Sequence, residues 1–143
     1  MKELELPVRT THEINIGEHA ATGNTIYLNP LIHLREEANP FKAATREFPV
    51  DFGNPIEKLF TIKINFPDGY VVDEMPKSKV MRLPDGSAKY TYNAVQVANT
   101  INVTSHFQIN KSLYVQTEYA ILREFYNQVI AKQAEQIVFK KKE

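Results

Sequence analysis

Hydrophobic and polar residues alternate with a period of two through the middle of this chain. The clearest runs are Phe60 to Phe66, in which the even-numbered positions are apolar, and Thr100 to Asn110, in which most odd-numbered positions are apolar. Such alternation is typical of strands that turn one face to a core and the other to water. A Pro-Asp-Gly turn triplet occurs at 67–69 and again at 84–86, and Ala98-Asn99 separates two long runs. The pattern therefore predicts strands joined by tight turns, with the last two long strands paired as a hairpin.

Shorter apolar runs predict further strands on both sides of this region. Phe48, Val50 and Phe52 share one face of such a run, and Pro49 inside it indicates an edge position or a bulge. Leu31 to Glu37 is ambiguous and is compatible with one helical turn. The other predicted strands are Glu3 to Thr10, Thr11 to Ile16, Asn24 to Asn29, Tyr70 to Glu74, Val80 to Leu83, Lys89 to Val97 and Ile137 to Phe139.

The apolar period changes to about 3.6 residues late in the chain, which predicts one amphipathic helix over residues 117–134. Thr117 is expected to cap this helix with its hydroxyl, and Glu118 is an acid where the helix dipole favours one. The predicted apolar stripe consists of Leu122, Phe125, Tyr126, Val129 and Ile130, supported by Tyr119 and Ile121.

Many strands that each bury one face need a second layer to cover that face. The predicted fold is therefore mainly β: an antiparallel β-sandwich, immunoglobulin-like or similar, whose C-terminal amphipathic α-helix covers an edge or an open end. Helices do not alternate with strands, which argues against a parallel α/β sheet. The length of 143 residues fits a single domain spanning residues 1–143.

Charge and composition narrow the classes of function. The 17 Lys and Arg residues equal the 17 Asp and Glu residues, so the formal net charge is zero and gives no reason to expect nucleic acid as a partner. No apolar run is long enough to span a bilayer, and we expect no membrane insertion. The chain has no cysteine, which excludes disulfides, thiolate metal sites and a cysteine nucleophile within it.

The remaining polar residues show no catalytic arrangement. No two of the four histidines have the spacing of a common metal motif, although a zinc site near His12 and His19 can be drawn with neighbouring glutamates. Ser105 and His106 are adjacent on a predicted strand, so they point to opposite faces and cannot form a dyad. We therefore expect no catalytic, cofactor-binding or metal-binding residue in this chain. Carboxylates at the turns, such as Asp68 and Asp85, have a structural explanation.

Three side chains are candidates for a binding surface. Tyr90 and Tyr92 share one face of a predicted strand, and His106 lies on the polar face of the next one. Exposed tyrosine rings can stack on sugar rings or on a partner peptide. Packing of the same rings in the core or at its rim is the competing interpretation.

Several longer segments carry a family resemblance. They are NPFK (39–42), REFPVDF (46–52), FPDGYVVDEMP (66–76), LPDG (83–86), INVTSHFQINKSLY (101–114) and EYAILREFYNQVIAKQAEQIVFKK (118–141). In these segments, and over residues 27–143 as a whole, the chain resembles the C-terminal domain of unknown function of Bacteroidetes transglutaminase-like proteins.

The resemblance implies a non-catalytic accessory domain that packs against or positions an upstream papain-like core with a Cys-His-Asp triad. None of that triad has a counterpart among the residues of this chain. The partner implied is that core in the same polypeptide, residues 1–23 are the expected joint to it, and the implied setting is exported or periplasmic. A glycan- or peptide-binding β-sandwich module is the alternative that we keep open.

Overall fold

The computed structural model describes residues 21–22, 24–31, 34–36 and 38–142. The predicted strands Glu3 to Thr10 and Thr11 to Ile16, and all of the expected joint over 1–23 except Ala21 and Thr22, lie outside the described residues. The strands are β1 (Ala21–Thr22), β2 (Thr25–Leu28), β3 (Val50–Asp51), β4 (Ile56–Asn65), β5 (Tyr70–Glu74), β6 (Lys79–Arg82), β7 (Ala88–Val97), β8 (Thr100–Ile109), β9 (Leu113–Tyr114) and β10 (Ile137–Lys141). A 3-10 turn (Gln116–Glu118) leads into the helix α1 (Tyr119–Gln133).

The mainly β prediction is confirmed by a long four-stranded antiparallel sheet in the order β4-β8-β7-β6. Its inner face follows from the alternation in β8, where Ile101, Val103 and Ile109 are fully buried. Residues directly opposite one another share a face, so Ile62 and Ala94, the partners of Val103, also face inward. The predicted β7–β8 hairpin is present, and Ala98 adopts a φ of 53° in its turn.

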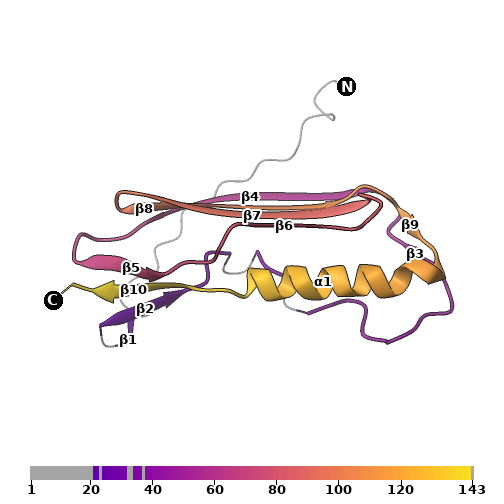
Figure 1. The fold of residues 1–143 in the computed structure, drawn as a ribbon, viewed down its shortest axis with the longest axis horizontal. Coiled ribbons are helices and arrows are strands. Elements are labelled where there is room, and N and C mark those ends of the chain that lie inside the picture. The colour runs from indigo at the N-terminus through magenta and orange to yellow at the C-terminus, as the bar shows by residue number, and fades with distance from the viewer. Residues whose placement is uncertain (1–20, 23, 32–33, 37, 143) are drawn as a thin grey trace, which may run out of the picture.

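The second layer is shared between a small sheet and the helix. Figure 1 shows α1 and the sheet β1-β2-β10-β5 lying end to end below the long sheet, because the chain leaves α1 and continues almost straight into β10. The rings of Phe125 and Tyr126 on α1 lie 6.0 and 5.5 Å from that of Phe107 on β8. The helix therefore packs on the inner face of the sheet and takes the place of a second sheet there. This position differs from the one predicted from the sequence, which was over an edge or an open end.

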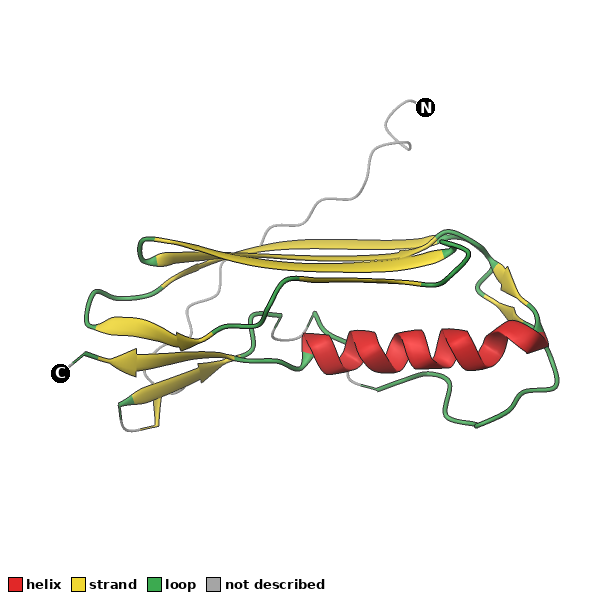
Figure 2. Cartoon of the chain, viewed as in Figure 1, coloured by secondary structure: helices red, strands yellow, loops and turns green. Residues whose placement is uncertain are grey.

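Figure 2 shows this β-sandwich-like arrangement with the helix under one half of the long sheet and strands under the other. Among the described residues, no helix is both long and apolar enough to cross a membrane.

One side of α1 is held by the segment before β3. Asn39 donates its side-chain amide to Arg123 O at 3.0 Å and to Asn127 Oδ1 at 2.8 Å. Arg123 Nε donates in turn to Phe41 O at 2.9 Å. Phe41 is buried edge-on against Tyr126, with the ring centroids 5.0 Å apart. The segment thus packs along α1 and stabilises its position, and Glu36 in the same segment bonds to Lys58 on β4.

The helix begins differently from the prediction. Thr117 does not cap it; Thr117 lies within the 3-10 turn, and α1 starts at Tyr119. The carboxylate of Glu118 instead accepts a hydrogen bond from the backbone N–H of Val115 at 2.9 Å and one from Lys111 Nζ at 2.5 Å. Both contacts lower the pKa of Glu118, the lysine contact more strongly. Ile121, predicted to support the apolar stripe, is 48% exposed.

The predicted strand around Pro49 is reduced to the two residues of β3, which pair with β9. Val50 is buried and Phe52 packs edge-on against Tyr114 at 5.9 Å, but Phe48 is 73% exposed. The prediction that all three side chains share one face of a strand is therefore wrong for Phe48, because pairing starts only at Val50.

Candidate functional site

The two tyrosines predicted as a stacking surface lie in the core. Tyr90 is fully buried and shares a hydrogen bond of 2.8 Å with Ser105 Oγ on the neighbouring strand. Tyr92 is 1% exposed, and its hydroxyl has no hydrogen-bond partner among the described residues. Burial raises the pKa of both phenols. Rings without exposed faces cannot stack on a sugar or a peptide, so the core interpretation replaces the surface one.

His106 lies on the other face of the long sheet. Its side chain is 27% exposed, and Nε2 lies 2.7 Å from Glu57 Oε1 on β4. The residues directly opposite it are Leu59 on β4 and Thr91 on β7. The structure therefore separates His106 from Tyr90 and Tyr92 by the thickness of the sheet, and the three do not form one surface.

Several hydroxyl and carboxylate side chains that could take part in catalysis form local hydrogen bonds instead. Ser105 is buried against Tyr90, while its neighbour His106 points outward, as the strand geometry predicts. Asp51 accepts a bond from the backbone N–H of Gly53 at 2.8 Å, and Asp85 accepts one from that of Ser87 at 3.0 Å. These contacts are those of turn-forming carboxylates.

The described residues contain no group of three His, Asp or Glu side chains placed to hold a metal ion. His12, His19 and His33 lie outside them.

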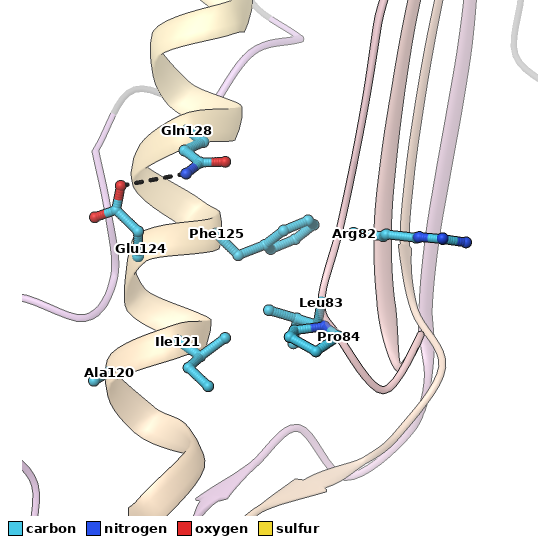
Figure 3. Close-up of a pocket in the computed structure, with 8 residues that line it drawn as sticks. All are labelled: Arg82, Leu83, Pro84, Ala120, Ile121, Glu124, Phe125 and Gln128. Atoms are coloured by element: carbon cyan, nitrogen blue, oxygen red, sulfur yellow. Dashed lines mark hydrogen bonds between the residues drawn. The ribbon is translucent and has the colours of Figure 1, made fainter.

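Two pockets lie between α1 and the edge of the long sheet formed by β6. The first, of about 320 Å³, lies beside the N-terminal half of the helix. In Figure 3, Ile121 and Phe125 point from α1 toward Leu83 and Pro84, while Arg82 points away from the helix. Phe125 and Leu83 are buried and form the floor, and the half-exposed Ile121 forms a rim. This helix-start pocket is apolar inside and has Arg82 and Glu124 at its margin.

The second pocket, of about 470 Å³, lies at the other end of β6 beside the C-terminal end of α1. Three lysines line this helix-end pocket, namely Lys77, Lys79 and Lys132, with Glu135 as the one acid. Lys132 is buried, its Nζ bonds to Glu135 at 2.9 Å and lies 5.3 Å from the centre of the Tyr92 ring. The pocket therefore has an excess of positive charge.

Neither pocket could be predicted from the sequence. Ile121 and Phe125 read as ordinary members of an apolar stripe, and Val80 to Leu83 as an ordinary strand. Only the pairing order of the sheet makes β6 an edge and brings α1 beside it.

Comparison with known proteins adds a family and a fold. The family described as "Domain of Unknown Function with solved-structure structure (DUF3858)" matches residues 24–139. No curated protein matches the chain. Among solved structures, one described as "a putative protease from Parabacteroides distasonis" superposes with a TM-score of 0.66 at 18% identity. The superposition covers 85% of this chain and 24% of that one, so this chain corresponds to about a quarter of the longer protein's length.

At 18% identity the superposition shows the shared fold alone. The family match, in contrast, runs from β2 to β10 and includes both layers of the fold. Since it spans well over half of the sequence, the chain belongs to the DUF3858 family of domains of unknown function.

Proposed function

We propose that this chain is a non-catalytic accessory domain of a longer, transglutaminase-like polypeptide, in which it packs against or positions the catalytic core. The observation that carries the proposal is the share of the similar structure that the chain covers: it superposes on 24% of a protein described as a protease. A domain of that relative size leaves most of the longer chain to supply the chemistry.

The local contacts support the same role. Three of the four serine hydroxyls are bonded to structural partners: Ser105 to Tyr90, Ser87 to Asp85 and Ser78 to Asn93. The fourth serine, Ser112, has no hydrogen bond to a described histidine or carboxylate. A hydroxyl nucleophile needs an adjacent base that is itself oriented by a third group. The described histidine, His106, has Glu57 beside it, but no described hydroxyl that bonds to it.

The alternative of a glycan-binding surface on Tyr90 and Tyr92 loses its basis, because both rings are buried. The exported or periplasmic setting stays part of the proposal and rests on the family resemblance only. Fractionation of cells that express the full reading frame tests that part directly.

The test of the accessory role uses the full polypeptide encoded by the reading frame and a version that ends before Asn24. We expect the shortened protein to retain its catalytic side chains but to melt at a lower temperature, and the separately purified domain to restore stability when added. Casein and small ester substrates serve as readouts of turnover. Turnover by the isolated domain that is abolished by a substitution of one of its own side chains would refute the proposal. A core that does not bind the domain, and whose melting temperature is the same with and without it, would refute the proposal as well.

A further inference from the structure

Among the described residues, no strand pairs with the outer backbone edge of β6. The N–H of Leu83 donates to Ala88 O of β7 at 2.9 Å. In an antiparallel pair the bonded residues alternate, so Met81 and Lys79 also turn their backbone groups toward β7. The N–H and C=O groups of Val80 and Arg82 must then point away from the sheet. No described residue bonds to them, which leaves donors and acceptors spaced for one more strand.

The other edge strand of the long sheet, β4, is less suited to accept a strand. Lys58 sits on its inner face, opposite Phe107, and bonds to Glu36 at 2.8 Å. A charged side chain that points inward at an edge opposes pairing with another chain, and β6 carries one as well at Lys79. The β4 edge differs because its inward lysine is already paired with Glu36 of a neighbouring segment. The segment that contains Glu36 also fills the side of α1 below that edge, as the bonds of Asn39 to the helix show. Below β6, by contrast, lie the two pockets.

The side chains along β6 define what a fifth strand would have to carry. Arg82 and Val80 face outward, and Val80 is 58% exposed. Met81 and Leu83 face inward, next to the apolar helix-start pocket. Lys79, at the near end, faces the helix-end pocket with its excess of lysine.

We propose that β6 and the flanking α1 form a docking site for an extended peptide segment that joins the long sheet by strand addition. The segment that fits is mainly apolar and carries two acidic residues, three positions apart. Acids belong opposite Arg82 and Lys79, and branched apolar residues belong opposite Leu83, Met81 and Val80, because opposite residues on paired strands contact one another. Main-chain bonds supply affinity in this mode of recognition, and the side-chain pockets supply specificity.

This inference goes beyond the accessory role and does not depend on it. If the accessory role holds, the segment belongs to the partner core; if it fails, the domain still binds such a segment. A peptide titration on the chain itself therefore separates the two proposals.

The probe is the fluorescent peptide Ser-Ile-Glu-Val-Val-Glu-Ser, which in antiparallel register places its five central residues opposite Leu83, Arg82, Met81, Val80 and Lys79 in turn. We expect saturable binding, with the N–H groups of Val80 and Arg82 protected from hydrogen exchange. N-methylation of the second valine, opposite Val80, removes a bond to the edge and should weaken binding about fivefold or more. N-methylation of the first valine, whose N–H faces away from β6, is the matched control and should have a much smaller effect.

In the protein, Val80→Pro removes the outward N–H of residue 80, which would bond to the peptide. Proline is tolerated on an edge strand where the N–H faces outward. Val80→Thr keeps the N–H and is its control. Arg82→Glu should weaken binding by roughly two- to fivefold, whereas Lys63→Glu on β4 should not. Absence of binding at millimolar peptide would overturn the proposal. Binding whose affinity is the same whichever valine is N-methylated would overturn it as well. Because the N-methyl comparison needs no change in the protein, the proposal stays testable even if Val80→Pro fails to fold.

Discussion

The hydroxyl of Tyr90 and Oγ of Ser105 lie 2.8 Å apart on neighbouring strands in the core of the domain. Both side chains are at most 1% exposed, so neither can exchange this hydrogen bond for one with water. Tyr92, opposite Ser105 on β7, has a buried hydroxyl without such a partner among the described residues. Two buried tyrosines on one strand face thus differ in whether the hydroxyl has a hydrogen-bond partner, which makes them a useful pair for comparison.

Tyr90→Phe and Tyr92→Phe should therefore affect stability in different ways. Tyr90→Phe leaves Ser105 Oγ buried without its partner and should lower the free energy of unfolding by about 1–3 kcal/mol. Tyr92→Phe removes a hydroxyl that gains no bond on folding and should leave stability unchanged or raise it by about 1 kcal/mol. Urea denaturation of the two variants checks the contrast. A double-mutant cycle with Ser105→Ala should show coupling for Tyr90 but not for Tyr92, and equal losses for both tyrosines would contradict this account.

The same burial predicts an alkaline transition. Desolvation raises the pKa of Tyr90, Tyr92, Tyr114 and Tyr126 above the unfolded value of about 10. For a group whose folded pKa is raised, the stability that it contributes is complete below the unfolded pKa and is lost as pH rises through the folded pKa. We expect these four phenols to ionise only above pH ~10 and together with unfolding. Tyrosinate absorbance and circular dichroism, recorded on the same sample with a denatured control, test this expectation. Full ionisation of all seven tyrosines in a chain that stays folded would be the opposite result.

The contacts of Phe41 predict which phenylalanine holds the helix in place. Its ring lies edge-on to those of Tyr126 at 5.0 Å and Tyr119 at 5.8 Å, and it is buried. Phe41→Ala should lower the free energy of unfolding by about 3–5 kcal/mol, through lost transfer energy and the cavity left behind. Phe48→Ala, in the same segment but at a ring that is 73% exposed, should change it by less than about 0.5 kcal/mol. Thermal melts of the two variants suffice, and a similar loss from both would show that the segment is not anchored as described.

The contrast between these two residues also shows how far the sequence could be interpreted. The strand with the cleanest alternation, β8, was predicted nearly to the residue, because the period of two fixes which side chains are buried. The alternation of β4 was also identified, but that strand begins at Ile56, four residues before the predicted run. Phe48 was misplaced because a hydrophobic residue in a short run carries no information about where pairing begins. Ile121 was misplaced because a helix stripe gives the buried face only approximately.

The candidate site could not be predicted for a different reason. An edge strand and an inner strand of the same sheet have similar patterns, so nothing in Lys79 to Arg82 marks β6 as open. That property comes from the order β4-β8-β7-β6, which long-range contacts decide. The tyrosine surface failed in the same way: the face of β7 that holds Tyr90 and Tyr92 was identified, but which face the second layer covers was not. Local periodicity thus predicts elements, and topology decides which of them are free to bind.

The two Pro-Asp-Gly triplets, at 67–69 and 84–86, form turns with different backbone conformations. Gly86 closes the turn between β6 and β7 with a φ of +73°, and an added Cβ would meet nothing within 4 Å. Any cost of Gly86→Ala must therefore come from backbone strain alone, which for the left-handed region is about 1–2 kcal/mol. Gly69, in the equivalent Pro-Asp-Gly triplet before β5, also has open space around it but no positive φ. Gly69→Ala should thus be neutral or stabilise the fold by up to about 1 kcal/mol, since alanine restricts the unfolded chain. Urea titrations of both variants measure the difference, and equal effects would mean that the two triplets, identical in sequence, form the same turn in solution.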